Sequence, residues 1–301
     1  MHGTPPHTVW AVAALLLNAL VWGLSWWPFK QLALHGLHPL WTTAIVYGLS
    51  FAAMAVWGKL VQTPRGAWRA HPGLWCLLIA SGMTNVGFNW AVTMGDVVRV
   101  VLLFYLMPAW SVLVAWWLLG DKPHAGALLR LLLALSGLAI VLHQPDSPWP
   151  VPESLADALA LLGGLSFAVT NALLLKLKNA PETARMQAMF GGGASMAMLT
   201  ALALSTQSMV TPSLHWMSIW NLPVLLLTLG FLLGNLALQY GTARLPAHTT
   251  ALVMLSEVVF ASVSSVLLGA STWDHRTLLG GALILLAAVL SIWMPNHNAK
   301  A

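Results

Sequence analysis

Residues 245–270, LPAHTTALVMLSEVVFASVSSVLLGA, form a long apolar run with a single carboxylate, Glu257, near its middle. As an α-helix rising about 1.5 Å per residue, a run of this length crosses the roughly 30 Å of hydrocarbon in a bilayer. Glu257 would then lie near the bilayer midplane, where an ionised carboxylate without a partner, water or a proton is unfavourable by about 3 kcal/mol or more. The rest of the chain must therefore supply surroundings that make this residue tolerable.

The composition places the whole chain in a membrane. Of its 301 residues, 58% are hydrophobic and only 7% are charged, and the mean hydropathy is +0.78. A soluble domain carries roughly 25% charged residues, so this chain cannot cover a water-facing surface. Its apolar runs are about 20 residues long and lack the alternation of barrel strands. We therefore expect an all-α integral membrane protein.

The charges and the possible metal ligands argue against several kinds of partner. The net charge of +5 and the pI of 9.7 do not indicate nucleic acid, because cytoplasmic loops of membrane proteins carry excess Lys and Arg. A single cysteine, Cys76, excludes an internal disulfide, and the histidines have no further ligands grouped near them. No phosphate-binding glycine motif occurs. We expect no metal or other cofactor, no nucleic acid, and a monomer whose partners are a small-molecule substrate and the lipid bilayer.

Hydropathy divides the chain into ten expected transmembrane helices. Residues 1–8 contain no Lys or Arg and lead straight into the first span, so we expect no removable signal peptide. Asp96 can cap the fourth span, and Pro246 suits the first turn of the ninth. Ser154 and Asp157 have the spacing of a capping box before the sixth. The expected spans are residues 9–29, 40–61, 74–94, 97–119, 125–143, 155–177, 184–205, 221–243, 246–269 and 277–294.

The positive charges predict the orientation of these spans. Even-numbered loops, the adjoining start of the fifth span and the C-terminus hold ten of the Lys and Arg residues. Odd-numbered loops and span ends hold three, Lys30, Arg99 and Arg276. Because positive residues accumulate on the cytoplasmic side, even-numbered loops and both termini should be cytoplasmic. Tryptophans near the span ends fit interfacial anchoring, namely Trp10, Trp41, Trp57, Trp75, Trp149, Trp220, Trp273 and Trp293.

The two halves of the chain, residues 1–148 and 149–301, share a loose pattern. At an offset of 150 residues, the segment 85–121 aligns with the segment 235–271. Five spans in each half is an odd number, so the second half must enter the membrane from the opposite side. Such inverted repeats are typical of secondary transporters, whose substrate site lies near the midplane between the repeats. Aligned residues are Asn85 with Asn235, Asn89 with Gln239, Trp90 with Tyr240, Pro108 with Val258, Trp22 with Phe167, and Ser25 with Thr170.

Short motifs in both halves resemble the EamA repeats of the drug/metabolite transporter superfamily. Members often show a Pro-centred helix followed by Leu-Gly-Glu, and a Glu-Pro-Val step at the matching place in the second repeat. Here LMP at residues 106–108 and LGD at residues 119–121 fit the first pattern, with Asp in place of Glu. SEVVF at residues 256–260 resembles the second, with Val258 in place of Pro, and Ala270 stands where an acidic residue is common.

The resemblance implies a ten-helix carrier of the bacterial inner membrane, with two inverted five-helix repeats around a central cavity. Members are often exporters, and often of amino acids, and their cavity is formed mainly by spans one, three, four, six, eight and nine. Efflux of cationic or aromatic drugs is the alternative, favoured by the tryptophans and one deep acid. We do not expect an enzyme, because no nucleophile–base pair or metal cluster recurs at one depth. A scaffold without flux would not need amide-lined faces on several helices.

Polar and aromatic residues recur at helical spacing on the expected cavity spans. Amides within a membrane need partners, so these faces should point inward and not toward lipid. For any single amide, hydrogen bonding between helices is the simpler explanation, and for any single tryptophan, packing is. Together they predict a polar path with aromatic walls. The candidate cavity residues are Asn18, Trp22, Ser25, Trp26, Asn85, Asn89, Trp90, Tyr105, Trp110, Thr170, Asn171, Asn235, Gln239, Tyr240 and Glu257.

Two charged residues are candidates for coupling or gating. Glu257 could carry a coupling proton, bind a substrate ammonium group, or serve as a structural acid bonded to Ser256, Asn235 or Gln239. Arg99 begins the fourth span on the outer side, where Asp96 could pair with it. That pair would be either a simple helix-end contact, or an outer gate or anchor for a substrate carboxylate.

Overall fold

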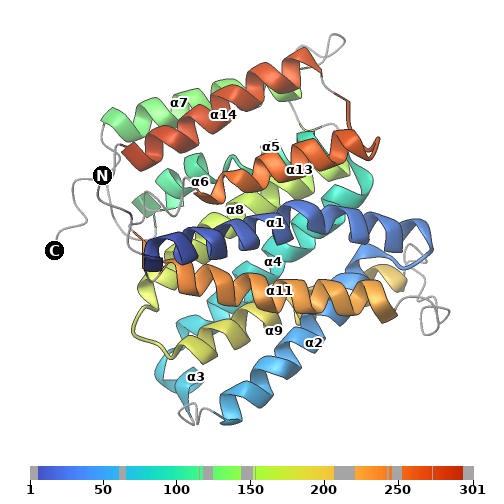
Figure 1. Ribbon diagram of the computed structural model, residues 1–301, viewed down its shortest axis with the longest axis vertical. Coiled ribbons are helices and arrows are strands. Elements are labelled where there is room, and N and C mark those ends of the chain that lie inside the picture. Colours follow the sequence, from blue (N-terminus) through green and yellow to red (C-terminus); the bar gives the residue numbers. More distant parts are fainter. Residues whose placement is uncertain are drawn as a thin grey trace.

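The computed structural model describes residues 6–60, 66–114, 116–117, 125–143, 152, 154–206, 221–242, 244–245, 253–272 and 274–293. These residues contain helices and no strand, which confirms the all-helical prediction for the described part of the chain. The helices are α1 (Pro6–Leu34), α2 (Pro39–Leu60), α3 (Ala67–Ala70), α4 (Gly73–Met94), α5 (Val97–Phe104), α6 (Met107–Val114), α7 (Ala125–Leu142), α8 (Leu155–Lys176), α9 (Glu182–Ser205), α11 (Asn221–Thr242), α13 (Ser256–Leu267) and α14 (His275–Trp293) (Figure 1).

Five stretches of the described chain are long and apolar enough to cross a membrane: Val9–Leu34, Pro39–Leu60, Val97–Val114, Leu155–Lys176 and Glu182–Ser205. The long helices lie roughly parallel or antiparallel, and α1 begins at the end of the bundle where α14 finishes (Figure 1). Many leucines on their outward faces are exposed. Such a surface is stable facing lipid, which is as apolar as leucine.

The fourth expected span, residues 97–119, is not one continuous helix. The structure breaks it into α5 and α6, with Tyr105 and Leu106 in a turn between them. Pro108 has no amide hydrogen, so the carbonyl of Phe104 cannot receive the bond that would continue the helix. A second turn, at Leu255, comes directly before α13 within the ninth expected span. The fourth expected span is therefore present as an apolar stretch over Val97–Val114, with a turn that was not predicted.

The helices pack into two groups joined side by side. In the first, which we call the α4 group, α4, α5 and α6 pack against α8. In the second, the α1 group, α11 and α13 pack against α1. α2 and α9 lie together beside both groups, and α7 and α14 lie together at the opposite edge (Figure 1). The two groups meet where α5 contacts α13 and where α4 contacts α1.

Glycines allow the close crossings within each group. A Cβ atom on Gly87 of α4 would lie 2.6 Å from the carbonyl oxygen of Leu159 in α8. One on Gly23 of α1 would lie 2.8 Å from the carbonyl oxygen of Glu257 in α13. Helices associate in membranes through this kind of close backbone approach, because lipid tails give no hydrophobic advantage to larger side chains. Residues at these crossings therefore fix how α8 and α13 are placed.

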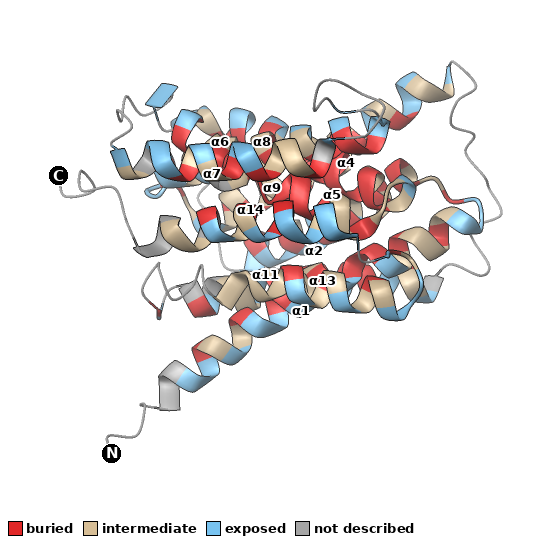
Figure 2. Cartoon of the chain, turned by 90° about the horizontal axis from the view of Figure 1, so that it is seen from above, coloured by how far each residue is buried: buried red, intermediate tan, exposed pale blue. Residues whose placement is uncertain are grey.

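The largest buried cluster lies where the two groups meet. It combines residues of α4, α5 and α8 with Trp26 of α1, and with Val258 and Ala261 of α13. Figure 2 shows buried residues gathered around α4, α5 and α9, whereas exposed residues are frequent along the outward faces. This cluster packs α5 against α13, next to the turn at Tyr105.

Candidate functional site

The side chain of Glu257 meets the break in the fourth span. Tyr105, which is 3% exposed and lies in the turn between α5 and α6, donates its hydroxyl hydrogen to Glu257 Oε2 at 2.9 Å. The same hydroxyl lies 3.5 Å from the carbonyl oxygen of Met254. Glu257 lies in the first turn of α13, directly after the turn at Leu255. One hydrogen bond thus joins the break at Tyr105, in the first half of the chain, to the start of α13 in the second half.

This partner differs from those expected for Glu257 as a structural acid. The hydroxyl of Ser256 donates to the carbonyl oxygen of Val253 at 2.6 Å, and the amide of Asn235 donates to that of Phe231 at 2.9 Å. Both side chains therefore bond to their own helical segments. The side chain of Gln239 lies outside the described residues. Tyr105 was a candidate cavity residue but not the expected partner of Glu257.

The amide of Asn85 joins two helices. Its Oδ1 accepts a 2.6 Å hydrogen bond from the hydroxyl of Tyr47 in α2, and its Nδ2 donates to the carbonyl oxygen of Ser81 at 2.8 Å. These bonds use both ends of the side chain. Asn85 therefore has the geometry of a helix-to-helix hydrogen bond.

Asn18 and Asn89 are different, because each keeps a buried acceptor. Asn18 Nδ2 donates to the carbonyl oxygen of Gly234 at 2.8 Å, and Asn89 Nδ2 donates to Thr43 Oγ1 at 3.2 Å. The side-chain oxygens of both have no hydrogen-bond partner among the described residues, although Asn18 is 0% and Asn89 1% exposed. Buried polar atoms are nearly always satisfied, so these two oxygens are suited to accept from water or a bound solute.

The four candidate tryptophans all take part in packing. Trp22 stacks on Phe231 with ring centroids 4.6 Å apart, and Trp26 donates its indole hydrogen to Ser264 Oγ at 2.9 Å. Trp90 meets the ring of His38 edge to face at 5.4 Å. Trp110 packs against a small cluster formed by α6, α7 and α14. Phe231 and Ser264, which sequence reasoning did not single out, are apolar or small and carry no signal that separates them from ordinary packing residues.

The remaining candidates lie at different places. Ser25 and Thr170 donate to carbonyl oxygens of their own helices, those of Trp22 and Ser166, at 2.8 and 2.9 Å. The side chain of Asn171 is exposed, although an inward-facing position was expected. Tyr240 is 37% exposed, and the Arg244 guanidinium lies 3.8 Å from its ring centroid, at the end of α11.

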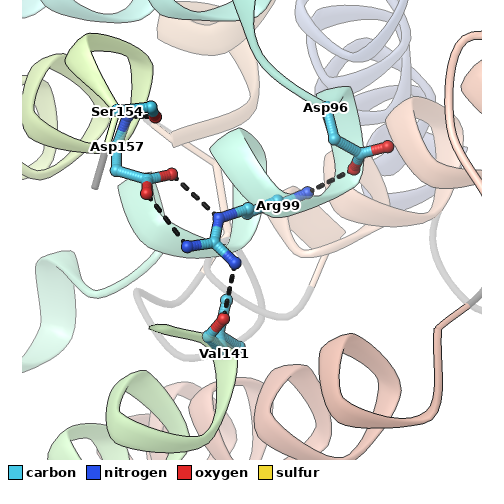
Figure 3. Close-up of polar contacts among 5 residues, drawn as sticks. All are labelled: Asp96, Arg99, Val141, Ser154 and Asp157. Carbon is cyan, nitrogen blue, oxygen red and sulfur yellow. Dashed lines mark hydrogen bonds and ion pairs between the residues drawn. The ribbon is translucent and has the colours of Figure 1, made fainter. Parts of the chain in front are cut away.

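Arg99 makes a three-way connection at the other end of α5 (Figure 3). Its guanidinium donates from Nε and Nη2 to the two carboxylate oxygens of Asp157, both at 2.9 Å, and from Nη1 to the carbonyl oxygen of Val141 at 2.7 Å. The side chains of Arg99 and Asp157 are 22% and 4% exposed. This bidentate geometry is the strongest form of an Arg–carboxylate contact.

The expected ion pair between Asp96 and Arg99 was wrong. Asp96 instead caps α5, since its Oδ1 accepts from the backbone N–H of Arg99 at 2.9 Å. Cap geometry directs the carboxylate to the backbone, and the Arg99 side chain extends toward α8. The caps predicted at Asp96 and Ser154 are confirmed, because Ser154 Oγ also accepts from the backbone N–H of Asp157 at 3.0 Å, whereas Pro246 lies outside the described residues. Asp157 was overlooked as an ionic partner, although an acid in the first turn of an apolar span was a usable signal.

The described residues contain no group of three or more His, Cys, Asp or Glu side chains that could hold a metal ion. The polar groups of the candidate site described above are amides, hydroxyls, the Glu257 carboxylate and the Arg99–Asp157 ion pair. Such groups can bind a solute or a proton and can hold helices together.

Residues 9–143 match the model of a protein family described as the EamA-like transporter family. The match supports an EamA-type transporter of the drug/metabolite transporter superfamily. The match covers the first expected repeat and confirms the resemblance found in the motifs of that half. The match indicates a transporter of the drug/metabolite type, and the long apolar helices support a multi-pass membrane protein.

A solved structure extends the likeness in fold to the whole chain. A structure titled "Crystal structure of protein" superposes with a TM-score of 0.58 and is 18% identical, covering 95% of this chain and 96% of that one. At this identity the likeness concerns the fold alone. No curated protein matches the sequence. Substrate and mechanism therefore have to be argued from the site.

Proposed function

We propose that this protein is a secondary transporter that exports amino acids or related small metabolites by alternating access. The observation that carries the proposal is the Tyr105–Glu257 hydrogen bond, which joins two broken helices from opposite halves of the chain. Broken transmembrane helices typically form substrate and ion sites in transporters, because their free backbone groups and helix ends lie at membrane depth. The proposed carrier acts as a monomer in the bacterial inner membrane, with both termini in the cytoplasm.

The positions of the two breaks support an inverted repeat of ten spans, with residues 1–148 and 149–301 as the two halves. The turns lie at Tyr105 and Leu255, which are 150 residues apart, the same offset as in the sequence alignment. In both groups, helices from one half of the chain pack against a helix from the other half. α4 packs on α8 as α11 packs on α1, and α5 with α6 pack on α8 as α13 packs on α1.

The two helix groups supply the moving parts of the proposed mechanism. The α4 group combines α4, α5 and α6 with α8 from the second half, and the α1 group combines α11 and α13 with α1 from the first. Rocking of one group against the other would open the path to each side in turn. Because Tyr105 and Glu257 belong to different groups, their hydrogen bond forms or breaks with this motion.

The chemistry around the breaks favours a substrate with an ammonium group. The Glu257 carboxylate can pair with a cation, and the buried oxygens of Asn18 and Asn89 are additional acceptors. A substrate carboxylate would find positive backbone dipole at the starts of α6 and α13, which follow the two breaks. An amino acid combines both charges. The packed state of Trp22 and Trp26 argues against their serving as free walls for aromatic drugs.

A substrate panel in proteoliposomes tests the proposal. Purified protein should accelerate flux of at least one class of labelled amino acid, and Glu257→Gln should reduce that flux strongly. Glu182→Gln is the matched control, because Glu182 is an exposed acid at the start of α9. Flux of a cationic aromatic dye without flux of any amino acid would support the drug-efflux alternative. Absence of amino-acid flux under every imposed gradient would refute the proposed substrate class.

A further inference from the structure

The Arg99–Asp157 pair joins three helix ends at one end of the bundle. Arg99 lies in the first turn of α5, Asp157 lies in the first turn of α8, and the carbonyl oxygen of Val141 belongs to the last turn of α7. Asp157 lies at a helix N-terminus, which favours an anion, and the Arg99 guanidinium reaches away from the N-terminus of α5 to a C-terminal carbonyl of α7, which favours a cation. Figure 3 shows the guanidinium between the two partners. This connection therefore fixes both the position and the rotation of α5.

α5 is held unequally on its two sides. Toward α8 it is held by the two 2.9 Å bonds of the ion pair, and Asp157 is almost fully buried. Toward α13, the first turn of α5 makes apolar contacts and a longer, 3.3 Å bond from the backbone N–H of Val98 to Ser271 Oγ, and the Tyr105–Glu257 bond lies at the far end of the helix. Hydrogen bonds between charged groups, such as this bidentate pair, are roughly twice as strong as neutral ones. Separation of α5 from α13 is therefore easier than separation of α5 from α8.

α5 also needs an external support. It has only 8 residues, and its other end is the break at Tyr105. A helix of about two turns is not stable by itself, so its placement depends on its contacts. Without the ion pair, the face of α5 that packs on α13 and covers Ser271 would no longer be held in register.

The second half of the chain has no charged counterpart of this pair. At the repeat offset of 150, Arg99 corresponds to Thr249 and Asp96 to Pro246. At the offset of 145 that relates the sixth span to the first, Asp157 corresponds to Val12. The inverted repeat would place these residues at the opposite, inner end of the carrier. The two ends are thus braced differently in the sequence itself.

We propose that the Arg99–Asp157 pair is a brace that keeps the outer side of the transport path sealed. This inference rests on the proposed orientation and inverted-repeat plan. The brace acts inside the α4 group and not across the boundary between groups. It holds α5 in the position from which α5 can close against α13 and Ser271.

Cysteine accessibility tests the brace. In a Cys76→Ser background, Ser271→Cys places a thiol at a site that is 8% exposed and covered by Val98. A membrane-impermeant maleimide added to intact cells should label it slowly. Asp157→Asn should raise the labelling rate by about tenfold or more, because the Arg99 guanidinium loses the carboxylate that holds α5 against α8. Thr272→Cys, the exposed neighbour, is the matched control and should be labelled equally with and without Asp157→Asn.

Two further variants keep the test decisive. Arg99→Lys retains the charge but not the two-pronged bond, so it should give a smaller, measurable rise even where Asp157→Asn does not insert. The double variant Arg99→Gln/Asp157→Asn leaves no unpaired charge and should be labelled less than Asp157→Asn alone. Unchanged Ser271→Cys labelling in Asp157→Asn and Arg99→Lys, with normal Thr272→Cys labelling, would overturn the brace. If Thr272→Cys is labelled only after permeabilisation, both the orientation and the brace are overturned. Transport itself is tested separately, by the flux measurements in proteoliposomes.

Discussion

The hydroxyl of Tyr105 donates a 2.9 Å hydrogen bond to Oε2 of Glu257. Tyr105 lies in the turn that divides the fourth span, and Glu257 lies directly after the turn that precedes α13. One hydrogen bond therefore connects the two halves of the chain at their turns. In the proposed transporter, the substrate site and the contact that opens and closes would both lie here. It also gives the one acid of residues 245–270 a neutral donor, which lowers the cost of keeping it in the membrane.

The first prediction concerns the role of Glu257 in coupling. Glu257→Gln should abolish acceleration of transport by a pH gradient, because the amide cannot carry a proton, so the reduced flux that remains should no longer respond to the gradient. The measurement is flux in proteoliposomes with and without an imposed gradient. Tyr105→Phe is the companion variant: it removes the hydrogen bond but keeps the carboxylate, so acceleration should persist. Unchanged pH dependence in Glu257→Gln would remove the proton role and leave a structural one.

The second prediction concerns the crossing of α4 and α8. Gly87→Ala should destabilise the protein by about 1–3 kcal/mol, because the new Cβ would lie 2.6 Å from a backbone carbonyl oxygen that cannot move aside. Gly48→Ala is the control in α2, since a Cβ there has no neighbour within 4 Å, and it should stabilise by about 0.5–1 kcal/mol. Denaturant unfolding in detergent measures both. Equal stability of the two variants would contradict the crossing.

The third prediction concerns His38 in the loop before α2. Burial lowers the pKa of His38 from its ordinary value of 6.5, and Nδ1 accepts a 3.3 Å hydrogen bond from the backbone N–H of Leu40, which requires the neutral ring. Its contribution to stability should be complete above pH of about 6.5 and should be lost as the pH falls through the lower folded-state pKa.

Thermal unfolding between neutral and mildly acidic pH measures this effect. His38→Asn should remove part of the acid-dependent loss, because an Asn oxygen can accept from Leu40 without titrating. The exposed His35 provides the matched control as His35→Asn. An identical pH profile in His38→Asn and the natural protein would show that His38 does not contribute.

The fourth prediction concerns orientation. A reporter fused after Ala301 should indicate a cytoplasmic C-terminus, because ten of the thirteen Lys and Arg residues lie in even-numbered loops, the start of the fifth span or the C-terminus. A phosphatase fusion and a fluorescent fusion give opposite signals for the two sides, and each controls for the expression of the other. A periplasmic result would invert every assignment of outer and inner ends.

Local signals in the sequence were reliable wherever short-range chemistry decides the outcome. Asp96 and Ser154 cap their helices as expected, since an N-cap depends only on residues two or three positions away. The break at Tyr105 was missed although Pro108 marks it, because proline is tolerated within many membrane helices and its effect depends on neighbouring packing. The partner of Arg99 was assigned to the nearest acid, Asp96, whereas the folded chain brings Asp157 closer.

By itself, the sequence determined that this protein is a helical membrane protein whose residues 9–143 match the EamA-like transporter family, with one acid deep in an apolar run. Hydropathy and motifs suffice for that, because a bilayer admits few backbone structures and helix ends are set by adjacent residues. Only the tertiary structure decided that Glu257 bonds to Tyr105 and that Arg99 bonds to Asp157. Contacts between residues 152 and 58 positions apart depend on which helices cross and at what level, and close backbone packing at glycines sets that level.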